Sequence, residues 1–101
     1  TIVVHRLERI SRSPEIMAEL GVENRVIKLA HFYEMLKIQN QGQDGPLLVN
    51  RYANIAYIED ENGTVWAVNA GWGSVDREWY VDAISVENPD EWGGGHQVLS
   101  R

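Results

Sequence analysis

The sequence predicts an α+β domain in which an N-terminal strand, a short helix and a long helix pack on an antiparallel sheet of about three to five strands. Three observations predict this class: a β-branched run at the start, apolar residues at helical spacing over 25–39, and an Asn-Gly pair between two β-rich segments. The 101 residues are 44% apolar and 24% charged, which is typical of one globular domain. We expect a single domain over 1–101, with a glycine-rich C-terminal tail over 90–101.

The first elements are predicted to be short. Thr1–Ile10 opens with β-branched residues and favours a strand. Ser13-Pro14 then favours a helix start, with Ser13 as the N-cap and Pro14 in the first turn. Gly21 is expected to end this helix directly after Leu20.

A second, longer helix is predicted over 25–39, with Asn24 as its cap. Its polar residues fall at every third position, so they wind around the helix and leave most of its surface apolar. We expect both helices to pack on one sheet face. The excess apolar surface of the long helix predicts either a sheet that curls around it or a homodimer formed through it.

The clearest local signal is Asn62-Gly63, a preferred pair for a two-residue hairpin turn. A two-residue loop would place Tyr57 opposite Val68 and Glu59 opposite Trp66, which puts the two aromatic rings on one sheet face. Further along, Trp72 is expected in a glycine loop and Glu78–Val86 as a strand. The tail is expected to be held through Trp92, Val98 and Leu99, either as a short edge strand or by contact with a neighbouring molecule.

The formal charge of −6 is unevenly distributed along the chain. Residues 1–40 contain six basic and five acidic residues, whereas residues 41–101 contain three basic and ten acidic ones. The acidic half disfavours direct nucleic-acid binding, because it repels phosphate, and would attract a basic protein. No apolar run reaches the roughly 20 residues that a membrane helix needs, so we expect a cytoplasmic protein without membrane contact.

Catalytic and metal-binding patterns are absent from the sequence. The chain has no cysteine, and His5, His31 and His96 form no helical zinc pair. Ser74 follows a glycine but lacks the surroundings of an activated nucleophile. We therefore predict no catalytic residue, no metal and no cofactor.

These observations favour a non-enzymatic interaction module, similar in role to an inhibitor or immunity protein, whose acidic, Trp-bearing half docks a basic protein partner. Tryptophan and tyrosine provide large rigid contact areas and are enriched at interfaces. The predicted partner-binding residues are Tyr57, Glu59, Asp60, Glu61, Trp66, Trp72 and Trp92.

The alternative is a small-molecule or sugar-binding domain, or a minimal enzyme, with a pocket between the long helix and a curled sheet. His31, Tyr33 and Asp82 would then line the pocket, together with Tyr57 and Trp66. Asp82 is of interest because it lies among apolar neighbours in its predicted strand, where inward burial would raise its pKa.

Overall fold

A computed structural model describes residues 2–87 and 91–101, and it places five strands in one sheet of order β1-β5-β2-β3-β4. Only the β2–β5 pair is parallel, so the sheet is mixed and mostly antiparallel. The predicted α+β class is confirmed. The elements are β1 (Val3–Arg6), α1 (Ser13–Leu20), α2 (Leu29–Ile38), β2 (Asn54–Glu59), β3 (Val65–Gly73), β4 (Glu78–Ser85) and β5 (Gln97–Ser100).

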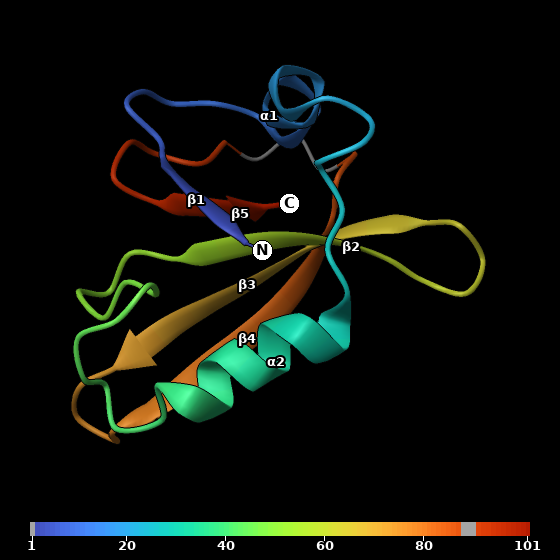
Figure 1. Ribbon diagram of the computed structural model, residues 1–101. Helices are drawn as coiled ribbons and strands as arrows, with labels where there is room; N and C mark the ends of the chain where they lie inside the picture. The colour runs from blue at the N-terminus through green and yellow to red at the C-terminus, as the bar shows by residue number, and fades with distance from the viewer. Residues whose placement is uncertain (1, 88–90) are drawn as a thin grey trace.

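The two helices cover opposite faces of the sheet (Figure 1), so the expectation that both pack on one face was wrong. Strand β2 explains this arrangement, because five consecutive residues, Asn54 to Ile58, are buried. Successive side chains of a strand point to opposite faces, so a strand buried along its length needs a cover on each face. One core joins Ala56 and Ile58 to Phe32 and Leu36 of α2, and the other joins Ile55 and Tyr57 to Ile16 and Met17 of α1.

Helix α1 begins one residue before the predicted position. Ser13 lies inside the helix, and the Glu15 carboxylate accepts a hydrogen bond from the amide of Arg12, which is the N-cap (3.0 Å). The hydroxyl of Ser13 instead points into the core, where Tyr57 Oη donates to it at 3.0 Å and Trp92 Nε1 at 3.3 Å.

Helix α2 is shorter than predicted, because the segment before Leu29 is not helical. Val26 forms a parallel β-bridge with Tyr57, and the Ile27 amide donates to the Tyr57 carbonyl (3.1 Å). Pairing between β2 and β5 ends at Ala56, so this extended segment satisfies the backbone of β2 just past that point. The two β-branched residues tolerate extended backbone well.

The β2–β3 hairpin has a three-residue loop, which corrects the predicted two-residue turn. The Asp60 amide donates to the Thr64 carbonyl (2.8 Å), and Gly63 takes a φ of 82° that favours glycine. The register therefore shifts by one residue, and Tyr57 pairs with Ala67 while Trp66 pairs with Ile58. The two aromatic rings consequently lie on opposite faces of the sheet.

Strand β3 continues through Trp72, which was predicted to lie in a glycine loop. Trp72 is buried beside Trp79, with ring centroids 5.2 Å apart and planes at 72°. The loop after α2 closes over this pair, since Trp79 Nε1 donates to the Gln39 carbonyl at 3.2 Å. The buried Gln39 amide group in turn bonds both backbone groups of Leu47.

The C-terminal segment forms an interior strand, so the predicted edge strand was wrong. Strand β5 lies between β1 and β2, and all four of its residues are buried. Before it, Trp92 forms an antiparallel bridge with Ser11. Asp90, the first residue of the predicted tail, lies outside the described residues. Because Val3 pairs with Ser100, the two ends of the chain lie side by side (Figure 1).

Candidate functional site

An open groove of about 750 Å³ lies between the N-terminal end of α2 and the β2–β3 hairpin. We call it the hairpin groove. In Figure 1 the hairpin extends beyond this end of α2. Its lining residues are Val26, Ile27, Lys28, Leu29, Ile58, Glu59, Asp60, Glu61, Trp66, Val68, Ala83 and Arg101.

The floor of the hairpin groove is apolar. Ile27, Ile58 and Val68 are buried parts of the α2-side core, and the half-buried Trp66 packs against them. Leu29, the first residue of α2, remains 39% exposed at the mouth. The apolar surface that a ligand could contact therefore comes mainly from Trp66 and Leu29, and the buried Ile27, Ile58 and Val68 pack behind it.

The rim on the hairpin side is acidic, since Glu59, Asp60 and Glu61 are consecutive and exposed. Lys28 and Arg101, both exposed, line the groove as well. Among the described residues, the one ion pair within 4.0 Å joins Arg12 to Glu91, so no cationic side chain of this part of the chain neutralises the hairpin acids.

Asp60 organises the hairpin tip and positions Trp66. One of its carboxylate oxygens accepts hydrogen bonds from the amides of Asn62 and Thr64 (both 2.9 Å), and the other accepts from Trp66 Nε1 (3.0 Å). The Trp66 bond, followed by the Thr64 amide, holds the pKa of the Asp60 carboxyl below its usual value. Asp60 is therefore a fixed anion at neutral pH, attached to an indole at the groove.

The structure brings together four of the seven predicted partner-binding residues. Glu59, Asp60, Glu61 and Trp66 all line the hairpin groove. The remaining three lie elsewhere: Tyr57 and Trp72 are buried in the core, and the half-buried Trp92 bonds to Ser13. Tyr57 and Trp72 consequently present no ring to a partner.

The residues predicted for an interior pocket are not brought together. His31 and Tyr33 lie on the exposed side of α2, and Asp82 is exposed on β4. Apolar side chains fill the space between α2 and the sheet, from Phe32 on the helix to Ala70 on β3. A ligand would therefore have to bind at the end of α2 rather than beneath it.

Sequence reasoning missed eight of the twelve lining residues: Val26, Ile27, Lys28, Leu29, Ile58, Val68, Ala83 and Arg101. Val26, Lys28 and Leu29 were assigned to a continuous helix, which hid the change to extended backbone at the groove. Arg101 reaches the groove because β5 lies inside the sheet, a long-range pairing with no local signal.

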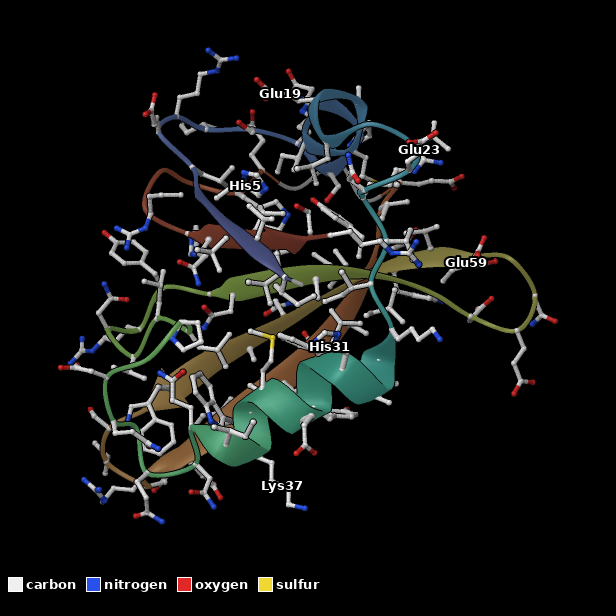
Figure 2. All side chains as sticks on the ribbon, viewed as in Figure 1. His5, Glu19, Glu23, His31, Lys37 and Glu59 are labelled. Atoms are coloured by element: carbon white, nitrogen blue, oxygen red, sulfur yellow. The ribbon has the colours of Figure 1, made fainter. Side chains whose placement is uncertain are left out.

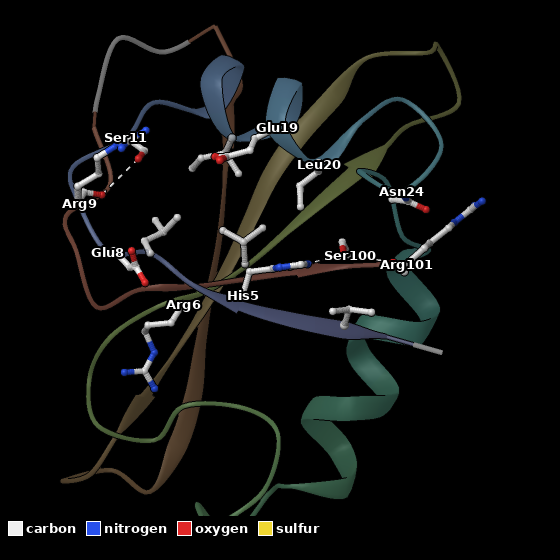
Figure 3. Close-up of a pocket in the computed structure, with 14 residues that line it drawn as sticks. His5, Arg6, Glu8, Arg9, Ser11, Glu19, Leu20, Asn24, Ser100 and Arg101 are labelled. Carbon is white, nitrogen blue, oxygen red and sulfur yellow. Dashed lines mark hydrogen bonds between the residues drawn. The ribbon is translucent and has the colours of Figure 1, made fainter.

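A second hollow of about 550 Å³, the N-terminal hollow, lies beside β1 on the α1 side of the sheet (Figure 3). Within it, His5 Nε2 lies 2.8 Å from the Ser100 hydroxyl. Its charged lining residues are of both signs, including Arg6, Arg9, Glu8 and Glu19. In Figure 3 these charged side chains do not converge on one point, which argues against a site for a small charged ligand.

Comparisons with known proteins give no match: no protein-family model, no curated protein and no solved structure is similar to this chain. Within residues 2–87 and 91–101, no three histidine or acidic side chains are grouped as a metal site would require. Neither helix in this part of the chain has the length and apolar character needed to span a bilayer.

Proposed function

We propose that this chain is a non-enzymatic interaction module that binds a basic segment of another protein in the hairpin groove. The supporting observation is the contact between apolar surface, formed by Trp66 on the floor and Leu29 at the mouth, and the acidic rim at 59–61. An interface needs an apolar centre to exclude water and a charged rim to select its partner, and this groove has both.

Charge favours a basic partner over a neutral one. Residues 41–101, which form β2 to β5 and the hairpin, contain ten acidic and three basic residues. Such a surface accelerates encounter with a positively charged protein, and this acceleration weakens as salt is added. The role resembles that of an inhibitor or immunity protein acting on a basic target, and we place it in the cytoplasm.

The groove's own chemistry favours binding over catalysis. Asp60 has a lowered pKa and three hydrogen-bond donors, so it is suited to holding a charge rather than to exchanging protons at neutral pH. The other acids of the rim are exposed to solvent. Their natural role in this position is attraction of cationic side chains.

Affinity capture from a lysate of the source organism, followed by mass spectrometry, tests this function with two variants of the groove. Leu29→Ser removes apolar surface from the mouth and is expected to weaken capture by about tenfold or more. Glu59→Gln with Glu61→Gln removes two charges from the rim and is expected to reduce both capture and its sensitivity to salt.

Each variant has a matched control elsewhere on the molecule. Ile38→Ser truncates an exposed apolar residue at the other end of α2. Glu19→Gln with Glu23→Gln makes the same change in net charge on the α1 side, away from Glu59 (Figure 2). The function requires a basic protein that both controls capture as the wild type does and that both groove variants capture more weakly. Equal capture by all four proteins would contradict it.

The second candidate is a small-molecule site, because about 750 Å³ lies within the range of small-ligand pockets. In that case the same groove would bind an apolar compound rather than a protein. A thermal-shift screen distinguishes the two, since a compound that stabilises the wild type but not Leu29→Ser would favour the small-molecule site.

A further inference from the structure

Strand β4 forms one outer edge of the sheet, because among the described strands it pairs with β3 alone (Figure 1). It has eight residues, whereas β1 at the opposite edge has four. Two central residues of β4 are open to solvent, Tyr80 at 52% and Val81 at 40%. A long exposed edge is a template on which another strand can pair.

The hydrogen-bond pattern of the β2–β3 hairpin determines which backbone groups of β4 point away from the sheet. The Asp60 amide donates to the Thr64 carbonyl, so even-numbered residues of β3 face β2 and odd-numbered ones face β4. Asn69 pairs with Asp82, which turns the even-numbered residues of β4 toward β3. The amides and carbonyls of Val81 and Ala83 therefore point away from the sheet.

The side chains of β4 divide by face. Val81 and Ala83 lie on the α2 side, and Ala83 is part of the hairpin groove. Glu78 and Asp82 lie on the other side and are both exposed. The groove is thus continuous with the β4 edge, and a strand laid along that edge would meet apolar surface on one face and carboxylates on the other.

Asp82 also occupies part of this edge itself. Its carboxylate accepts a hydrogen bond from the Ala83 amide (2.9 Å), one of the outward groups. An unpaired edge is commonly protected by a charged side chain of this kind. A basic incoming residue compensates the carboxylate, whereas an acidic or neutral strand leaves it uncompensated.

We infer that the partner's segment binds as an extended strand added to the β4 edge, with alternating apolar and basic side chains. Its apolar side chains enter the hairpin groove past Ala83, and its basic side chains lie opposite Glu78 and Asp82. Main-chain hydrogen bonds to Val81 and Ala83 give the pairing, and the groove and carboxylates select the sequence. This inference rests on the proposed function and adds the conformation and residue pattern of the partner.

Two synthetic eight-residue peptides test the residue pattern, both capped at their ends and composed of four valines and four lysines. In one the residues alternate, and in the other the valines precede the lysines. Both have the same charge, but only the alternating peptide places all its lysines on one face of a strand. We expect the alternating peptide to bind at least tenfold more tightly, with an affinity that falls as salt is added.

Two proline variants test the pairing. Val81→Pro removes an outward amide from β4. Val4→Pro is its control on β1, where the bond from the Leu7 amide to the His96 carbonyl places the Val4 amide outward too. Val4 is 44% exposed, close to the 40% of Val81, and proline is tolerated at such edge positions. Binding of the alternating peptide should fall at least tenfold in Val81→Pro and remain unchanged in Val4→Pro.

If Val81→Pro does not fold, hydrogen exchange on the wild-type protein replaces it, and the peptide should slow exchange at the Val81 amide. Equal binding of the two peptides, no effect of Val81→Pro, or no protection at Val81 would each overturn strand addition. A molecular mass in solution that rises with the concentration of the wild-type protein, and that stays at the monomer value in Val81→Pro, would overturn it as well. In that case the β4 edge would bind a second copy of the chain. Capture that Leu29→Ser abolishes, with neither peptide bound, would retain the proposed function and reject the added strand.

Discussion

At the scale of single residues, a buried hydroxyl pair joins the two halves of the chain. Tyr57 Oη donates to the Ser13 hydroxyl, which also accepts from Trp92 Nε1, so β2, α1 and the C-terminal segment meet at one oxygen. The sequence pattern predicted Tyr57 and Trp92 as partner-binding residues and Ser13 as a helix cap. Their joint burial depends on a long-range contact between residues 44 positions apart, which no local pattern indicates.

Tyr57→Phe tests that contact. Loss of the hydrogen bond should lower the free energy of unfolding by about 1 kcal/mol at neutral pH. Burial raises the pKa of Tyr57 above its usual 10.0, and the hydrogen bond to Ser13 lowers it by less. The folded protein therefore favours the protonated phenol, and the free energy of unfolding that this preference contributes is present below pH 10 and is lost as the pH rises further. Urea unfolding at pH 7 and above pH 10 should show the alkaline loss in the wild type and a smaller loss in Tyr57→Phe. Tyr33→Phe, at a residue 48% exposed, should match the wild type at both.

His96 gives a second prediction, in the acidic range. Its Nδ1 accepts a hydrogen bond from the Ala53 amide (2.8 Å), which requires an unprotonated Nδ1, and burial lowers its pKa below 6.5. As the pH falls, His96 is therefore protonated at a higher pH in the unfolded chain than in the folded protein. The contribution of His96 to the free energy of unfolding is fully present above pH 6.5 and declines as the pH falls from there toward the folded-state pKa. Thermal melts from pH 7.5 to 5 should show this decline. His96→Asn, which keeps an acceptor without the titration, should flatten it, and the exposed His31→Asn should not. A wild-type melting temperature that is constant over this range would contradict the assignment.

At the scale of elements, the structure departs from the sequence prediction mainly where hydrogen bonds to individual backbone groups set the start of a helix or the length of a loop. The helix-spaced apolar residues located α2, and the Asn-Gly pair located the hairpin. The three-residue loop depends on the Asp60 side chain, which accepts hydrogen bonds from two backbone amides at the tip. The turn preference of an Asn-Gly pair does not take these side-chain hydrogen bonds into account. The one-residue change in register places Trp66 on the opposite sheet face from Tyr57, where it lines the hairpin groove.

The loop after α2 provides a prediction at this scale. Gly42 has a φ of 67°, and a Cβ there would overlap the Trp72 ring. Gly42→Ala should therefore combine backbone strain with overpacking and cost about 2–4 kcal/mol of unfolding free energy. Gly63→Ala is the control, since it has a φ of 82° with no atom within 4 Å and should cost only the strain, about 1 kcal/mol. Denaturant unfolding of both measures the difference, and equal losses would show that the loop does not press on Trp72.

At the scale of the whole molecule, the class was predictable and the site was predictable in part. The charge asymmetry and the acids at the hairpin tip are local features of the sequence, and they were sufficient to predict Glu59, Asp60 and Glu61 as part of the candidate surface. The apolar floor was not predictable, because it forms from three parts of the chain that only the sheet order β1-β5-β2-β3-β4 brings together. Burial of β2 on both faces also required a helix on each side, which removed the interior pocket.

The most direct test of the central claim is where the captured partner contacts the folded protein. Titration of the ¹⁵N-labelled chain with that partner gives this map from amide chemical shifts. Binding in the hairpin groove predicts the largest changes over 26–29 and 58–61 and at the Trp66 indole N–H, with little change around His5 and Ser100. Changes centred on the N-terminal hollow, or spread evenly over the sheet, would contradict the claim that this groove is the binding site.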